Sequence, residues 1–258
     1  ANAGASVGSM LASGRDAFVL FNVEPELDCH DGAGALTALE KATFVVSFSS
    51  YVTEQMEAYA DVLLPIGTFA ETPGTFMNAS GLWQGFEDVV HPHADARPGW
   101  RVLRVLGNFL DLDGFEYRDT ASVMEEVLAA APAGLCENHG AWTVPGAVPN
   151  GVDGLWRVGD VPLYSVDAVV RRSAPLQATS DAGRAEVRVN PATADALSIA
   201  DGGRARVSQG TGSAVLDVHV DETVADDCVY IPAGLKETSA LAGMTGPVKV
   251  ERAGEAEG

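Results

Sequence analysis

Cysteine is scarce in this sequence of 258 residues. Its three cysteines, Cys29, Cys136 and Cys228, lie far apart and form no CxxC or CxxH pair. An odd, sparse set excludes a disulfide framework and favours a reducing compartment. An iron–sulfur cluster normally takes four protein thiolates, so the sequence predicts no such cluster on this chain.

Basic residues are also few. Lys and Arg number 16 against 36 Asp and Glu, which gives a formal net charge of −20. Acidic surface repels nucleic acid over a Debye length of about 8 Å, so we expect no nucleic-acid partner. No apolar run approaches the roughly 18 residues that cross a bilayer, so we expect no direct membrane insertion. The chain opens without Met or a leader peptide, which predicts a fragment or a processed chain.

Short motifs of common active sites are missing. The sequence contains no GxGxxG, Walker P-loop, HExxH or GxSxG, so we predict no catalytic residue. His91 and His93 stand two positions apart, with Asp88 and Asp95 nearby. A metal site would need further ligands, and a solvated surface loop explains the pair more simply, so we predict no metal.

Hydrophobic patterning is plentiful and indicates an α/β domain in residues 1–131. Strand-like and helix-like runs alternate, which is typical of an open parallel sheet. The first run is apolar throughout and predicts a strand buried on both faces. We expect strands at 17–23, 44–48 and 61–65, and helices at 34–41, 53–58, 100–110 and from 119 or 120 through 128.

The last part of the chain has a different pattern. Short segments alternate at period two between Gly-rich turns in residues 179–253, which predicts a small β-barrel. Residues 132–178 show no persistent period and predict an irregular connector, with 160–164 extended along an edge. Residues 254–258 predict a frayed tail. The barrel strands are expected at 185–189, 204–208, 214–220, 228–232 and 248–250, with one helix at 191–197.

One loop gathers polar side chains. Residues 66–99 are rich in Gly, Pro, Asn and Thr, and loops after strand ends in α/β sheets often contact ligands. Four side chains there fit loop-internal hydrogen bonds and a binding site equally well. They are Glu71, Thr75, Asn78 and Gln84.

Arg171 and Arg172 form the one basic doublet of the acidic first 178 residues. A solvated surface pair is one interpretation. Arginine also binds carboxylates through paired hydrogen bonds, so the doublet is an interface candidate for a carboxylate-rich partner.

The polar loop and the strand before it resemble a family signature. YADVLLP at 59–65, FAE at 69–71 and GTFMN at 74–78, followed by Gly81 and Gln84, resemble the signature of the molybdopterin oxidoreductase superfamily. ARPGW at 96–100 resembles the segment that follows it. The terminal unit, with VNP at 189–191, resembles the superfamily's six-stranded, double-psi-type domain. The resemblance implies a truncated parallel-sheet, Rossmann-like domain followed by a double-psi-type β-barrel.

Within the superfamily, VPLYSVD at 161–167, followed by Arg171 and Arg172, is similar to the large iron–sulfur subunit of bacterial NADH:quinone oxidoreductase, or respiratory complex I. The likeness implies a C-terminal, non-catalytic scaffold and interface segment that supports electron transfer from NADH to quinone. Its implied partners are the other hydrophilic-arm subunits, and its implied location is cytoplasmic, peripheral to the inner membrane. The iron–sulfur clusters would lie in an N-terminal part outside this sequence.

Two positions depart from the signature. Leu82 stands where cofactor-binding relatives carry arginine, and Ser80 where they carry glutamate. An apolar side chain offers no guanidinium to an anionic pterin, so we expect no cofactor on this chain. The alternative is the C-terminal half of a molybdopterin-dependent oxidoreductase of formate dehydrogenase or nitrate reductase type. In that case Glu71, Thr75, Asn78 and Gln84 would line the pterin cleft.

Overall fold

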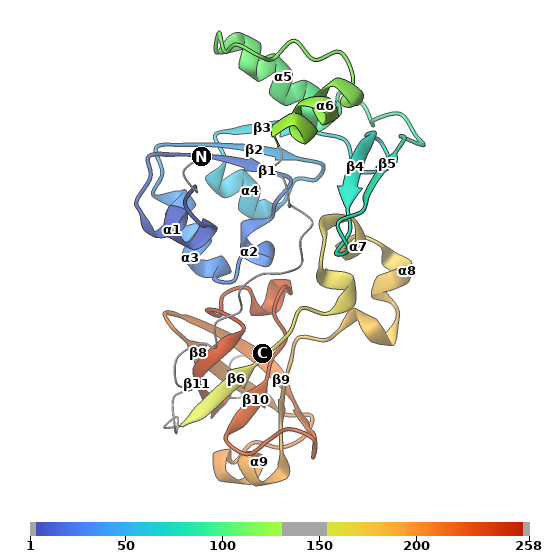
Figure 1. Cartoon of the computed structure of the whole chain (residues 1–258). Helices are drawn as coiled ribbons and strands as arrows, with labels where there is room; N and C mark the ends of the chain where they lie inside the picture. The colour runs from blue at the N-terminus through green and yellow to red at the C-terminus, as the bar shows by residue number, and fades with distance from the viewer. Residues whose placement is uncertain (1–3, 131–153, 255–258) are drawn as a thin grey trace.

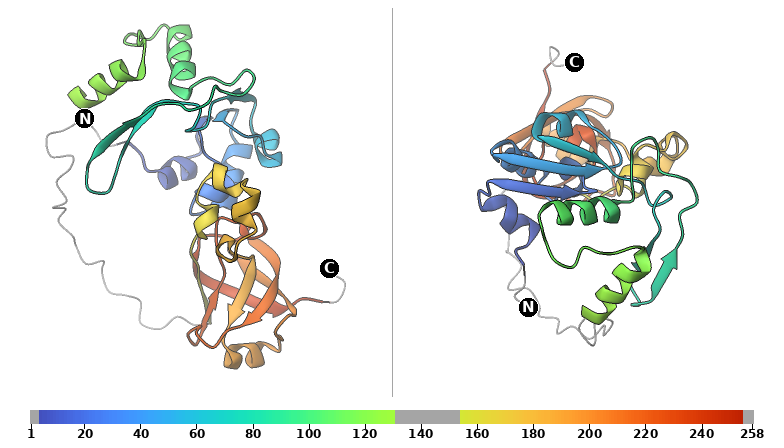
Figure 2. Two further views of the ribbon diagram at one scale, coloured as in Figure 1. Left: turned by 90° about the vertical axis from the view of Figure 1, so that its right-hand side faces the viewer. Right: turned by 90° about the horizontal axis from the view of Figure 1, so that it is seen from above.

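The computed structural model describes residues 4–130 and 154–254. It stacks an α/β part on a β-barrel, with α7 and α8 beside the junction (Figures 1 and 2). No helix in these ranges is long and apolar enough to cross a membrane. The elements of the first part are α1 (Val7–Ala12), β1 (Ala17–Phe21), α2 (Pro25–Asp28), α3 (Gly32–Glu40), β2 (Phe44–Ser49), α4 (Glu54–Tyr59), β3 (Val62–Pro65), β4 (Gly74–Met77), β5 (Trp83–Phe86), α5 (Gly99–Phe109) and α6 (Thr120–Ala130).

The α/β part is built on a three-stranded parallel sheet in the order β1-β2-β3. Helices α3 and α4 supply the apolar core of one sheet face, where Leu39 and Met56 pack with Val45 of the central strand. Thr53 caps α4 by accepting a hydrogen bond from the Met56 N–H, which explains why that helix begins there. These elements confirm the predicted parallel sheet and its alternation with helices.

Strand β1 differs from its prediction. It lies at the edge of the sheet, and its residues alternate between half-buried and exposed, with Val19 63% exposed. Phe18 and Leu20 face the core of α3 and α4. On the opposite face, α5 approaches so closely that a Cβ on Gly99 would lie 2.6 Å from the Phe21 ring. Periodicity recognises an apolar strand but does not say whether it will be central or at an edge.

The barrel is closed, with strand order β10-β6-β11-β8-β9-β7. Two of its strand pairs, β10–β6 and β7–β9, are parallel, and the others are antiparallel. Its interior is aliphatic, rich in buried valines such as Val187, Val207 and Val229. The elements of this part are β6 (Leu155–Val158), η1 (Leu163–Ser165), α7 (Ala168–Arg171), α8 (Ala174–Gln177), η2 (Ser180–Ala182), β7 (Glu186–Val189), α9 (Pro191–Leu197), β8 (Arg204–Gln209), β9 (Gly212–Val220), β10 (Cys228–Tyr230), η3 (Lys236–Thr238) and β11 (Thr245–Arg252).

The region predicted as an irregular connector is more ordered than expected. Strand β6 falls within residues 132–178 yet belongs to the barrel, because it pairs with β10 and β11 from the end of the chain. The stretch predicted to extend over 160–164 runs into the short turn η1. Residues 131–153 and 255–258, with Cys136 and most of the predicted tail, lie outside the described residues.

Candidate functional site

The three parallel strands pair side by side, so their carboxyl ends share one edge of the sheet. In open parallel sheets this edge is the usual place for ligands. The turn after β1 contains Asn22, which adopts a left-handed conformation with φ 51°. The turn leads into Glu24 and α2, whose residues pack toward the barrel.

Glu24 anchors an ion-pair cluster at this edge. Its carboxylate is 2% exposed and lies 3.0 Å from Arg171 Nη1 and 2.7 Å from Arg172 Nη2. Arg171 also pairs with Asp28, and Arg172 stacks over the Tyr51 ring at 4.3 Å. The carboxylates that bind the predicted basic doublet therefore belong to this chain, and they join α7 to α2.

Glu26 lies beside the cluster, buried and without a full set of hydrogen bonds. Its Oε2 has no partner among the described residues, and neither does the hydroxyl of buried Tyr59. Burial raises the pKa of Glu26, and the negative charges of Glu24 and Asp28 raise it further. Burial also raises the pKa of Tyr59, and the negative charges of Glu26 and Glu24 raise it further. An unsatisfied acid of this kind is a candidate ligand-binding group.

A cleft of about 330 Å³ opens between these residues and the barrel. We call it the junction cleft. A neighbouring cavity of about 240 Å³ lies toward the barrel and shares Glu26 as a wall. The junction cleft is defined by Glu24, Glu26, Leu27, Thr53, Glu54, Gln55, Arg171, Arg172, Lys236 and Ser239.

Arg157 shapes the barrel side of the neighbouring cavity. This β6 side chain is 1% exposed, and burial lowers its pKa to about 10. Its guanidinium donates to the Gln209 side chain and to carbonyl groups of two loops. These carbonyls belong to Ile231, Pro232, Ala242 and Gly243. The buried charge thereby fixes the two loops that form part of the cavity wall.

The structure separates the four polar residues of the long loop. Glu71 accepts hydrogen bonds from the Thr68 N–H and hydroxyl and from the His93 N–H, and these bonds lower its pKa. Asn78 accepts from the N–H groups of Ser80 and Leu82 at the tip of the β4–β5 hairpin. Both side chains are therefore used within the loop. Thr75 and Gln84 lie on the paired strands β4 and β5.

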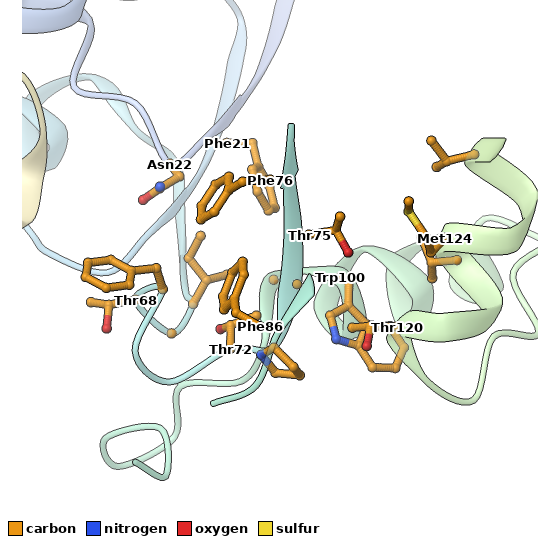
Figure 3. A pocket seen from close by; sticks show the side chains of 18 of the residues that line it. Phe21, Asn22, Thr68, Thr72, Thr75, Phe76, Phe86, Trp100, Thr120 and Met124 are labelled. Atoms are coloured by element: carbon orange, nitrogen blue, oxygen red, sulfur yellow. The ribbon is translucent and has the colours of Figure 1, made fainter. Parts of the chain in front are cut away.

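Thr75 lines an apolar cavity of about 440 Å³ beside the hairpin. Figure 3 shows Phe21, Phe76 and Phe86 around this space, with Trp100 on the side of the helices. Phe76 and Phe86 stack with their ring centroids 4.9 Å apart. Glu71, Asn78 and Gln84 are absent from the cavity wall, so the four residues do not converge on this cavity.

Within the described ranges, no group of three or more His, Cys, Asp or Glu side chains is arranged to hold a metal ion. His91 and His93 lie in the exposed loop, and the His93 backbone N–H bonds to Glu71. The structure therefore shows a role for His93 in holding the loop together through its backbone.

Of the residues that line the junction cleft, sequence reasoning singles out Arg171 and Arg172 and misses the others. It gives Glu24, Glu26 and the nearby Arg157 no role. The available signal is the pair of acidic residues flanking Pro25 directly after an apolar strand. In a parallel sheet that position lies at the ligand-binding edge.

Two family profiles match this chain. Molybdopterin oxidoreductase matches residues 4–109, and the molybdopterin dinucleotide-binding domain matches residues 161–255. Two proteins named "Putative formate dehydrogenase", from Staphylococcus aureus strains USA300 and MRSA252, are 27% and 26% identical over 236 residues. These alignments cover 76% of this chain and 24% of each relative, so the chain spans about a quarter of their length.

Among solved structures, acetylene hydratase from Pelobacter acetylenicus shares the fold. The TM-score is 0.62 at 14% sequence identity, over 92% of this chain and 44% of that chain. At this sequence identity the similarity shows a shared fold and nothing more.

The match to the dinucleotide-binding domain overturns the expectation of no cofactor on this chain. That domain points to a molybdopterin cofactor site on this segment. The expectation rested on Leu82, which lies 57% exposed at the hairpin. One exposed hairpin position carries no information about the barrel, which has its own family match.

Proposed function

We propose, from the molybdopterin oxidoreductase and molybdopterin dinucleotide-binding domains that this chain carries, that it is the C-terminal part of a molybdopterin-dependent oxidoreductase of formate dehydrogenase type. The relatives named as putative formate dehydrogenases support this proposal over a complex I subunit. Because the chain spans about a quarter of the length of those relatives, we propose the substrate and the reaction for the full-length protein and not for this segment alone.

The observation that carries the proposal is the junction cleft. It lies at the carboxyl edge of a parallel sheet, and residues of the second matched domain form its other side. A nucleotide-bearing group needs positive charge near its phosphates and acceptors for the N–H groups of its base. Lys236, which lies 3.6 Å from the exposed carboxylate of Glu54, supplies positive charge, and the unpartnered Oε2 of Glu26 supplies an acceptor. Arg171 and Arg172 are already paired with Glu24 and Asp28.

The role of this chain is then to bind and orient the nucleotide end of the cofactor. When bound, that cofactor supplies the metal-centred two-electron chemistry of the enzyme. Glu26 would accept hydrogen bonds from the base, and Lys236 would face the phosphates. The Glu24–Arg171–Arg172 cluster would hold α2 and α7 at a fixed spacing across the cleft. The buried loops around Arg157 would exclude water from the barrel side.

The test uses the full-length protein from a host that makes molybdopterin. Molybdenum is measured by mass spectrometry, the pterin by fluorescence after oxidative release, and the nucleotide by chromatography after hydrolysis. We expect molybdenum, pterin and nucleotide each well above trace amounts, and a marked loss of all three in a Glu26→Leu, Lys236→Gln double variant. The matched control is Lys249→Gln, an exposed lysine on β11 outside the cleft. Full-length protein with only trace molybdenum and pterin would reject the proposal.

A second candidate is a segment of the iron–sulfur subunit of NADH:quinone oxidoreductase, working as a scaffold beside other hydrophilic-arm subunits in the cytoplasm. The similarity of residues 161–172 to a stretch of that subunit favours it. The discriminating experiment is affinity purification of the tagged full-length protein under mild conditions. Co-purification of NADH-oxidising subunits, with quinone reduction by the isolated assembly, supports this candidate. Formate oxidation by the protein without such subunits supports the first.

A further inference from the structure

A different concavity, of about 630 Å³, opens along α5 and the residues that precede α6. In Figure 1 these helices lie above the sheet, on the side away from the barrel. We call this concavity the α5 cleft. It shares no lining residue with the junction cleft. Its polar and aromatic walls are Arg97, Trp100, Arg101, Arg104, Tyr117 and Arg118.

The α5 cleft concentrates positive charge in an acidic domain. Residues 4–130 contain six Lys and Arg side chains, and four of them line this one cleft. In the part of the chain that the structure describes, none of these four arginines forms an ion pair. Guanidinium groups gathered without a paired carboxylate repel one another, and a bound anion would relieve that repulsion.

Two residues that line the cleft have buried donors without acceptors. The indole Nε1 of Trp100 and the Nε of Arg104 are shielded from solvent, and neither donates to an acceptor among the described residues. The two residues are four positions apart on α5 and therefore share one helix face. Buried N–H groups are nearly always paired in folded proteins, so these two are unsatisfied hydrogen-bond donors next to the four arginines.

The start of α5 adds to the positive potential. The first turn contains no acidic side chain, and its N-cap, Pro98, makes no side-chain hydrogen bond. The aligned peptide dipoles leave partial positive charge at this end, where acidic residues are normally preferred. This helix instead has Arg101 there, stacked at 5.2 Å on the Trp100 ring. The local sequence thus opposes helix stability and favours anion binding.

We propose that the α5 cleft binds a small phosphate-bearing anion such as pyrophosphate or the diphosphate of a nucleotide. Its volume lies within the range of about 300–1,000 Å³ that is typical of small-molecule pockets. Phosphate oxygens accept paired hydrogen bonds from guanidinium groups, and four such groups line this cleft. The Tyr117 hydroxyl is already committed to Glu126, so the tyrosine contributes a fixed aromatic wall.

The test is isothermal titration of the full-length protein with pyrophosphate, ADP and inorganic phosphate at two salt concentrations. We expect saturable binding of pyrophosphate or ADP at one equivalent, weakened by added salt. An Arg101→Gln, Arg118→Gln double variant should weaken binding at least tenfold, because both side chains are exposed and their loss should spare the fold. Arg104→Gln tests the buried donor in the same way. Arg15→Gln, an exposed arginine outside the cleft, is the matched control and should bind like the parent.

Three results would overturn the proposal: no saturable binding of any of the three anions, equal binding by parent and cleft variants, or tight binding of a poly-glutamate peptide with none of pyrophosphate. The last would reassign the cleft to an acidic protein partner. Molybdenum and pterin content is measured in the same samples. Because the α5 cleft shares no residue with the junction cleft, that content should stay constant in the cleft variants, which keeps this proposal separable from the proposed function.

Discussion

Replacing Glu24 by glutamine removes one charge from the centre of the ion-pair cluster while keeping its shape. The parent carboxylate is 2% exposed and contacts Arg171 at 3.0 Å and Arg172 at 2.7 Å. Each contact would give about 5.5–6 kcal/mol of Coulomb attraction at an effective dielectric constant near 20, before desolvation is subtracted. Breaking a buried pair from one side typically costs about 3–5 kcal/mol.

The expected loss for Glu24→Gln is somewhat below that range, about 2–3 kcal/mol, because Asp28 still pairs with Arg171 and Arg172 is 31% exposed. Urea unfolding measures it as a shift in midpoint at constant slope. The control is Glu251→Gln, which breaks an exposed pair with Lys249 and should cost less than about 0.5 kcal/mol.

A double-mutant cycle completes the experiment. Glu24→Gln combined with Arg172→Gln should show a coupling energy of about 1–2 kcal/mol, since the two side chains are in contact. If Glu24→Gln is no more destabilising than Glu251→Gln and the coupling vanishes, the cluster does not hold α7 against α2. The spacing of α2 and α7 across the junction cleft would then not depend on this cluster.

For three further substitutions, the structure sets the direction of the change in stability. Burial raises the folded-state pKa of Glu26, so its contribution to stability is largest at low pH and is lost as the pH rises from about 4.5 through the folded pKa. Glu26→Gln should therefore raise the melting temperature at pH 7 and leave it unchanged near pH 3. Glu71 has a lowered pKa, so its contribution is present above about pH 4.5 and is lost as the pH falls through the folded pKa. Glu71→Gln should lower the melting temperature at pH 7 and have no effect near pH 2. Gly107→Ala should destabilise by about 1–3 kcal/mol in urea unfolding, because its Cβ would lie 2.2 Å from Phe115. The matched helical control, Gly8→Ala, meets nothing within 4 Å and should stabilise by about 0.5–1 kcal/mol.

Local periodicity predicted the three parallel strands and the helices α3, α4, α5 and α6, because each has its own apolar pattern with turn or cap residues at its ends. It gave no prediction for α1, α2, β4 and β5. Helix α4 is an example, with Thr53 as cap directly before the helical run. Strand β6 escaped detection for the opposite reason. Four residues alone are too short to show a period, and they are extended because β10 and β11 pair with them from more than 65 positions further along the chain.

The candidate site divides in the same way. The fate of Asn78 was within reach of sequence reasoning, since its hydrogen bonds go to residues two and four positions ahead. The partners of Arg171 were beyond it, since Glu24 and Asp28 lie more than 140 positions earlier. The basic doublet alone indicates that two arginines will bind carboxylates, but not where those carboxylates lie. Only the packing of α7 on α2 shows that this chain supplies them.

The closure of the barrel sets an order of events during synthesis. Strand β6 is made early, but its neighbours β10 and β11 come roughly 70 to 90 residues later, which at about 5–20 residues per second is a delay of several seconds or more. Throughout that interval the Arg157 guanidinium stays hydrated, because every one of its acceptors belongs to residues 209–243. The nascent barrel therefore gains little from partial folding, and a ribosome stalled before β11 would present an open chain to chaperones and proteases.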